Sequence, residues 1–137
     1  AFCIEQAAKA RKNAYTPYSD YKVGAAVVSA KTNRVYCGCN VENSSYGATI
    51  CAERNAILNA VANEGAVGIK LVVVVSQDAP PAPPCAQCLQ VLAEFSKPET
   101  EIHLVDVHYA EGREGAHSAY TFSELLPLPF IFPSMRS

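Results

Sequence analysis

Two short motifs in this chain have the residue types and spacing of a catalytic metal site. One is Cys51-Ala52-Glu53-Arg54, and the other is Cys85-Ala86-Gln87-Cys88. Two cysteines separated by two residues at a helix start direct both thiolates to one metal ion, and a third cysteine at another helix start completes the set. Three protein ligands with an open fourth position are typical of catalytic zinc, whereas structural zinc usually has four. The motifs therefore predict a Zn²⁺ site with Cys51, Cys85 and Cys88 as ligands.

Glu53 lies two positions after Cys51, close enough to reach a metal-bound water without being a ligand itself. A carboxylate in that place can take a proton from water and deliver it to a substrate. Cys-x-Glu followed by Pro-Cys-x-x-Cys is already known as the pattern of zinc-dependent deaminases, with the glutamate as general acid and base. The alternatives are a solvated surface carboxylate for Glu53, and a structural zinc or buried free thiols for the cysteines.

The electrostatics of such a site call for groups that draw negative charge from the sulfurs. Zn²⁺ with three thiolates has a net negative formal charge, which weakens its ability to acidify water. Helix N-termini supply partial positive charge and free N–H groups, and all three cysteines lie at predicted helix starts. Arg54, directly after Glu53, is a further candidate donor to a thiolate; a surface ion pair is its alternative.

The elements that position these motifs follow from hydrophobic periodicity and from Gly and Pro. Helices are predicted over residues 2–15, 51–63 and 85–95, with a helical turn over 123–126. Strands are predicted over 23–30, 34–41, 69–76, 101–107 and 117–122, the first two forming a hairpin. This order predicts an α/β fold, a three-layer α/β/α sandwich around one mixed, roughly five-stranded sheet. With 137 residues, we expect one catalytic domain over 1–137.

Composition and charge limit the partners. The net charge of −2 provides no basic face for a nucleic acid, so a small-molecule substrate fits better. The longest apolar stretch, 69–75 with Lys70 inside it, is too short to span a membrane. The first residues mix charged with apolar side chains and contain no signal-peptide core, so we expect a cytoplasmic location. In that reducing compartment, clustered cysteines more often bind metal than form disulfides.

Five motifs in order resemble the small homotetrameric zinc-dependent cytidine deaminases, over residues 15 to 130. They are Tyr18-Ser19-Asp20-Tyr21-Lys22-Val23-Gly24-Ala25-Ala26, Asn40-Val41-Glu42-Asn43-Ser44-Ser45-Tyr46-Gly47, Cys51-Ala52-Glu53-Arg54, Pro84-Cys85-x-x-Cys88 and Glu124-Leu125-Leu126-Pro127. The resemblance implies a cytidine-deaminase-like fold and zinc-dependent hydrolysis of cytidine or deoxycytidine to uridine or deoxyuridine, with release of ammonia. It also implies a homotetramer with shared active sites, and no membrane or nucleic-acid partner.

The resemblance also implies roles for individual residues. Cys51, Cys85 and Cys88 match the zinc ligands, Glu53 the proton shuttle and Arg54 the arginine that bonds a thiolate. The residues that match substrate-binding positions are Asn40 and Glu42 at the ribose 3′-hydroxyl, Tyr21 and the backbone of Ala52 at the base, Tyr46 from a neighbouring subunit at the sugar, and Phe130 from another subunit on the base. Turn formation is the alternative for Asn40 and Glu42, and ordinary packing for the three aromatic residues.

The chain departs from the family at positions that could affect the substrate. Ala86, Gln87 and Leu89 replace the usual Gly, Ala and Arg, while the cysteine spacing is kept. Tyr21 stands where Phe is usual, and residues 78–83 replace the usual Ser before Pro-Cys. These differences leave two alternatives: the same chemistry on a modified or antibiotic aminopyrimidine nucleoside of the blasticidin type, and a catalytically silent zinc-binding module.

Overall fold

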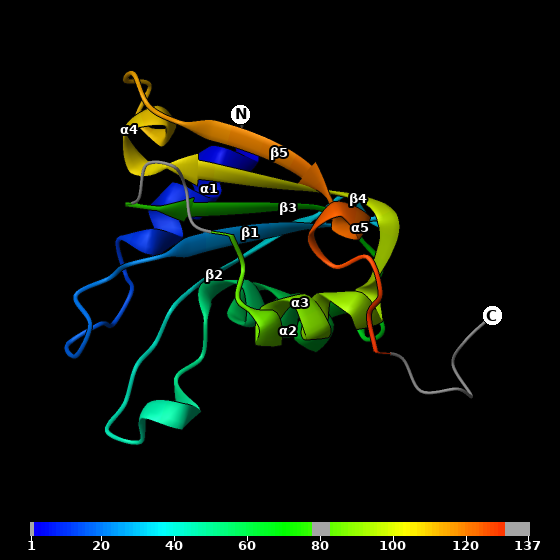
Figure 1. Cartoon of the computed structure of the whole chain (residues 1–137), viewed down its shortest axis with the longest axis horizontal. Helices are drawn as coiled ribbons and strands as arrows, with labels where there is room; N and C mark the ends of the chain where they lie inside the picture. Colours follow the sequence, from blue (N-terminus) through cyan, green and yellow to red (C-terminus); the bar gives the residue numbers. More distant parts are fainter. Residues whose placement is uncertain (1, 78–82, 131–137) are drawn as a thin grey trace.

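A five-stranded mixed sheet lies at the centre of the fold (Figure 1). The computed structural model describes residues 2–77 and 83–130. The strands are β1 (Gly24–Ser29), β2 (Val35–Cys39), β3 (Ile69–Ser76), β4 (Ser96–Asp106) and β5 (His117–Thr121), in the spatial order β2-β1-β3-β4-β5. Strands β3 and β4 are parallel, and every other neighbouring pair is antiparallel. The predicted hairpin is therefore present as β1 and β2.

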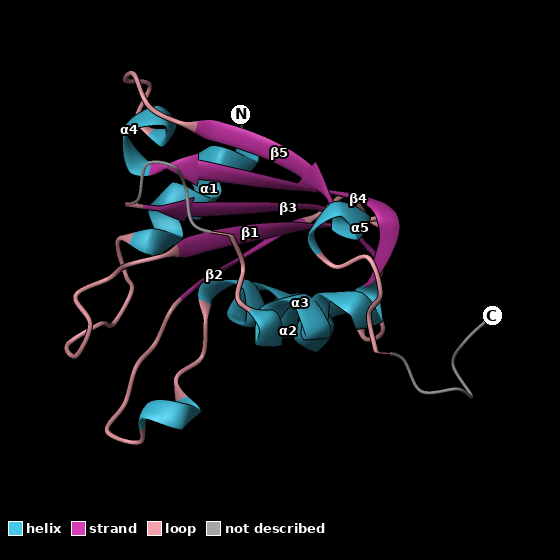
Figure 2. Ribbon diagram, viewed as in Figure 1, coloured by secondary structure: helices cyan, strands magenta, loops and turns pink. Residues whose placement is uncertain are grey.

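Helices cover both faces of this sheet (Figure 2). Helix α1 (Phe2–Arg11) packs on one face, and α2 (Ala52–Glu64) and α3 (Ala86–Phe95) lie on the other. Shorter helices are η1 (Tyr46–Ala48), α4 (Val107–Ala110) and α5 (Phe122–Leu125). The three-layer α/β/α prediction is confirmed.

The central strand β3 divides the core in two because its side chains alternate between the faces. Val72 and Val74 belong to the core beneath α2 and α3, whereas Val73 and Val75 belong to the core beneath α1. Burial on both faces explains why β3 is a nearly continuous run of β-branched residues. Ser76 is the next residue on the same face of β3 as Val72 and Val74. It therefore faces the layer formed by α2 and α3.

Helix α2 approaches β2 closely at Gly38. A Cβ atom at this position would lie 2.4 Å from the backbone nitrogen of Ala56 and 2.7 Å from the carbonyl oxygen of Ala52. Both of those atoms belong to the backbone of α2, which cannot move aside as the end of a side chain can. The absence of a side chain at Gly38 therefore sets how deeply α2, and the motif at its start, lies against the sheet.

The structure differs from the predicted elements in four places. Helix α1 ends at Arg11 rather than at residue 15, because the backbone of Tyr15 pairs with the segment after β2, donating to the Asn40 carbonyl (3.0 Å). Strand β4 begins at Ser96, earlier than predicted, and Thr100 supports its irregular start by donating to the Ile69 carbonyl (2.8 Å). Helix α4, capped by Asp106, and η1 were not predicted. Of the departure at 78–83, residues 78–82 lie outside the described residues.

Across the described ranges 2–77 and 83–130, none of the helices has the length and apolar character needed to cross a lipid bilayer.

We predict that Gly38→Ala destabilises the protein by about 1–3 kcal/mol, because the added methyl group overlaps the α2 backbone. Zinc affinity should fall as well, since α2 begins next to Cys51. Denaturant unfolding and a zinc competition titration measure the two effects. Gly68→Ala is the control, since its new Cβ meets only the Ala30 Cβ at 3.7 Å. Equal stability of the two variants would contradict the importance of the close approach.

Candidate active site

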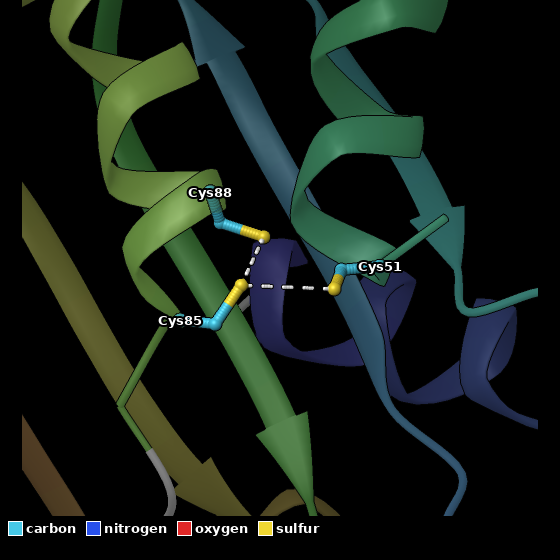
Figure 3. Close-up of side chains that lie close together, drawn as sticks. All are labelled: Cys51, Cys85 and Cys88. Carbon is cyan, nitrogen blue, oxygen red and sulfur yellow. Dashed lines mark hydrogen bonds between the residues drawn. The ribbon is translucent and has the colours of Figure 1, made fainter. Parts of the chain in front are cut away.

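Three cysteine side chains from two helix starts converge on one point (Figure 3). Cys51 is the N-cap residue of α2, Cys85 is the N-cap residue of α3, and Cys88 lies in the first turn of α3. The Sγ atoms of Cys51 and Cys85 are 3.8 Å apart, and those of Cys85 and Cys88 are 3.4 Å apart. All three sulfurs lie within 4.8 Å of one another.

This donor set fits zinc. Tetrahedral zinc with Zn–S bonds of about 2.3 Å separates its sulfurs by about 3.8 Å, close to the separations found here. Within residues 2–77 and 83–130, no fourth His, Cys, Asp or Glu joins the cluster. Three thiolates with a free fourth direction are the donor set of a zinc that binds water or substrate.

The helix starts and Arg54 stabilise negative charge on the sulfurs. Both N-cap cysteines have extended backbones, and the first N–H groups of α2 and α3 have no acceptor within their own helix. The guanidinium of Arg54 donates to the Cys51 sulfur (3.7 Å) and, from the same nitrogen, to the Thr49 carbonyl (3.0 Å). The helix N–H groups and the contact of Arg54 with Cys51 favour the thiolate, the form that binds metal.

The three thiols share their protons unequally. A hydrogen bond with Cys88, together with the Arg54 guanidinium, lowers the pKa of Cys51 to about 5. The pKa of Cys88 is raised, because Cys88 is hydrogen-bonded to Cys51 and is buried. Binding of a divalent metal displaces the protons that remain. One thiolate is thus available near neutral pH before the metal arrives.

Glu53 lies in the first turn of α2 and is only 5% exposed. Burial raises the pKa of its carboxyl group to about 7. A carboxyl group with a pKa near neutral can accept a proton and also return it. The exposed, solvated carboxylate considered as its alternative does not fit this burial.

A cavity of about 190 Å³ lies beside the cysteines and Glu53. The residues that line it come from several segments between positions 21 and 85: Tyr21, Val23, Asn40, Cys51, Ala52, Glu53, Val74, Ser76, Pro83 and Cys85. The predicted residues Tyr21, Asn40 and Ala52 thus share this cavity with Cys51 and Cys85. Sequence reasoning missed Val23, Val74, Ser76 and Pro83. The alternation along β3 is the signal that could have identified Val74 and Ser76.

Glu42 belongs to a second cavity, of about 290 Å³, lined by Tyr18, Ser19, Glu42, Tyr46 and Thr49. Its carboxylate accepts hydrogen bonds from the backbone N–H groups of Tyr18 (3.1 Å) and Ser19 (3.2 Å), and from the Ser19 hydroxyl. The Ser19 hydroxyl, together with these N–H groups, lowers the pKa of Glu42. The contribution of Tyr18 and Ser19 was not predicted.

Asn40 holds the segment that carries Tyr21. Its Nδ2 donates to the Tyr21 carbonyl (2.7 Å), and its Oδ1 accepts from the Val23 N–H (2.9 Å). The turn-forming alternative considered for Asn40 therefore describes part of what this side chain does, since its amide bridges the loop before β1. It lines the first cavity at the same time.

Tyr46 and Phe130 are exposed in the single chain. Tyr46 is 72% exposed and meets Tyr18 edge to face, with ring centroids 5.3 Å apart. Phe130 is 63% exposed, and its carbonyl accepts from Gln90 Nε2 (2.8 Å). Neither residue lines the cavity beside Glu53.

Most departures from the family pattern lie outside this cavity. Gln87 is exposed, and Leu89 packs against the core beneath α2 and α3. Among the described residues, Tyr21 and Pro83 are the substituted positions that line the cavity. The changes at 87 and 89 therefore alter the surface and packing of α3 rather than the walls of the site.

Residues 2–104 match the model of the cytidine and deoxycytidylate deaminase zinc-binding region. This match covers all three cysteines and Glu53. The chain belongs to this deaminase family. Zinc is the metal of this family's binding region, and the cluster of three cysteines could hold it.

Relatives of this deaminase cover nearly its whole length. It is 40% identical over 133 residues to a cytidine deaminase of Halalkalibacterium halodurans, covering 97% of this chain and 95% of that one. It is 39% identical over 127 residues to one of Sporosarcina psychrophila, covering 93% and 88%. The crystal structure of a Burkholderia pseudomallei cytidine deaminase matches with a TM-score of 0.84 at 40% identity, covering 94% of this chain and 97% of that one.

We predict that Arg54→Met lowers the zinc affinity of this deaminase about 10- to 100-fold, because the Cys51 thiolate loses a charged donor. The pKa of Cys51 should rise without that donor. Protons would then compete with the metal at higher pH, so zinc should be lost at a higher pH during acidification. Titration with a competing chelator at several pH values measures both effects. Arg113→Met is the control, since Arg113 is exposed and pairs with Glu111. Equal affinities in the two variants would contradict the role of Arg54.

Proposed function

We propose that this protein is a cytidine deaminase that hydrolyses cytidine and deoxycytidine to uridine and deoxyuridine, within one catalytic domain. The observation that carries the proposal is the buried Glu53 carboxyl group, which shares a cavity with Cys51 and Cys85. The relatives named above support the choice of substrate, since they carry the name cytidine deaminase.

In this proposal Cys51, Cys85 and Cys88 hold the zinc, and Glu53 moves the protons. Bound zinc supplies a water made acidic enough to act as a nucleophile near neutral pH. Glu53 takes a proton from that water and delivers it to N3 of the pyrimidine, while the water oxygen forms its bond to C4. Glu53 then passes the second water proton to the amino group. The C4–N bond breaks, and ammonia leaves.

The remaining residues bind the nucleoside. The free N–H groups at the start of α2, next to Ala52, face acceptors on the base, and Tyr21 lies along the same cavity. Glu42 is buried and carries a pKa below its usual range, so its carboxylate suits a sugar hydroxyl as hydrogen-bond partner. Asn40 positions the segment 21–23 through its hydrogen bonds to Tyr21 and Val23. Both ribose and deoxyribose have the 3′-hydroxyl.

A second candidate substrate is an aminopyrimidine nucleoside of the blasticidin type or another modified nucleoside. The specific observation behind it is that Tyr21, which stands where Phe is usual and carries a hydroxyl group, lines the cavity. The chemistry at Glu53 would be the same. A catalytically silent module is disfavoured, because a buried carboxyl with a raised pKa is costly to keep without a use.

We also propose that the protein acts as a homotetramer in the cytoplasm, with neighbouring subunits completing each site. Tyr46, Leu128 and Phe130 are large apolar side chains that the single chain leaves exposed. Such residues favour an interface. A reducing compartment keeps the cysteines available as metal ligands.

Glu53→Gln should lower kcat for cytidine by about 100- to 10,000-fold, because the proton shuttle is lost while the shape is kept. Zinc content should stay near that of the parent. Absorbance loss at the cytosine band and ammonia release measure turnover, and elemental analysis measures zinc. The parent is assayed on cytidine, deoxycytidine, cytosine and a blasticidin-type nucleoside. A parent that turns over only the last compound would replace the proposed substrate. A zinc-loaded variant as fast as the parent would refute the role of Glu53.

Sedimentation should find four copies of the chain in one particle. Phe130→Ala should raise the KM for cytidine about ten-fold, because the stacking of this ring on the base is lost. Tyr109→Ala is the matched control, since Tyr109 is also a partly exposed aromatic residue but lies in α4. A fully active monomer would contradict the shared active site.

A further inference from the structure

Ser76, the last residue of β3, has a buried hydroxyl group without a hydrogen-bond partner. The residue is 1% exposed, and its Oγ meets no donor or acceptor within the part of the chain that the structure describes. It also lines the cavity of about 190 Å³ that holds Glu53 and Cys85. None of the five motifs that identified the site includes this residue.

The position of Ser76 follows from the alternation of β3. Val72 and Val74 face the layer formed by α2 and α3, and Ser76 is the next residue in that row. Val74 and Ser76 both line the cavity. Figure 3 shows β3 passing the cysteines on the way to its carboxyl end. This face of β3 thus carries valines in the core and ends with the polar side chain of Ser76 at the cavity.

Two other buried hydroxyl groups in this protein are paired. Ser29 Oγ donates to Glu64 (2.8 Å), and Thr100 Oγ1 donates to the Ile69 carbonyl (2.8 Å). An unpaired hydroxyl in such a place destabilises the fold unless a partner arrives. A buried polar group without a partner calls for an explanation, and beside a cavity a bound ligand can supply that partner.

The polar groups of a cytosine base show which partner is missing. Its ring carbonyl is an acceptor, which the free N–H groups at the start of α2 can serve. Its N3 is the atom that Glu53 protonates in the proposed reaction. Its 4-amino group is a donor and needs an acceptor, but Asn40 Oδ1 already accepts from Val23 (2.9 Å). The Ser76 hydroxyl has accepting lone pairs available.

We propose that Ser76 Oγ accepts a hydrogen bond from the 4-amino group of the pyrimidine and so orients the base for attack at C4. This inference rests on the proposed function for the identity of the base. Ser76 would then give the site a preference for aminopyrimidines over pyrimidines that lack the 4-amino group. The valines before it in the row can only provide apolar contact.

The test measures binding in the Glu53→Gln background, so that cytidine is not consumed. Two ligands are compared, cytidine and the riboside of pyrimidin-2-one, which lacks the amino group. Adding Ser76→Ala should weaken cytidine binding about three- to ten-fold, the effect of one hydrogen bond. Binding of the pyrimidin-2-one riboside should stay within about two-fold, because it makes no bond to Ser76. With Glu53 intact, Ser76→Ala should lower kcat/KM for cytidine by a similar factor.

Thermal unfolding separates this role from a structural one. Ser76→Ala removes an unpaired buried hydroxyl, so the melting temperature without ligand should stay equal or rise. Ser96→Ala is the matched control, because Ser96 Oγ is also buried and unpaired but lies at the start of β4, away from the site. It should alter neither binding nor turnover.

Several outcomes would overturn the inference. Unchanged cytidine binding would refute it, and equal weakening of both ligands would assign the hydroxyl to another part of the nucleoside. A lower melting temperature together with zinc loss in Ser76→Ala would make the residue structural. Failure of the parent to deaminate cytidine would contradict the proposed function instead, since selective loss of cytidine binding would still support the contact with Ser76.

Discussion

The meeting of two helix N-termini is the constraint on which the site depends. Helices α2 and α3 begin at Ala52 and Ala86, and their first turns bring three sulfurs within 4.8 Å of one another. Three thiolates at such distances repel one another, so they require positive charge nearby. The helix ends, Arg54 and the metal supply it. If either helix start shifted by an ångström or two, the sulfur separations would no longer suit one tetrahedral zinc.

The sheet keeps these helix starts in register. Gly38 lets α2 lie directly on β2, and α3 connects the parallel strands β3 and β4. The right-handed preference of such crossovers places α3 beside α2 on the same face. The cavity then lies at the carboxyl end of β3, beside the two helix starts. The carboxyl ends of parallel strands are the usual place for a ligand in an α/β sheet. Tight packing elsewhere is what leaves a cavity of defined shape there.

Polar side chains near the cavity serve both the fold and the site. Asn40 uses its amide to hold the segment 21–23, and Glu42 gathers the N–H groups of Tyr18 and Ser19. These bonds settle the loop conformation before a substrate binds, which lowers the ordering cost of binding. Ser76 differs because its hydroxyl is left without a partner. Asn40 and Glu42 therefore build the cavity through their own hydrogen bonds, whereas the Ser76 hydroxyl is available to a ligand.

The sequence by itself predicted the two cysteine motifs, Glu53, the hairpin and the layer order, because each depends on local spacing or periodicity. Cys-x-Glu and Cys-x-x-Cys bring their residues together within one helical turn, whatever the remaining fold. The tertiary structure alone decided what lies opposite them: Ser76 at the end of β3, the approach at Gly38, and the separation of Phe130 from the cavity. These relations join residues far apart in the chain, and they arise from strand register and helix packing, for which neighbouring residues carry no signal.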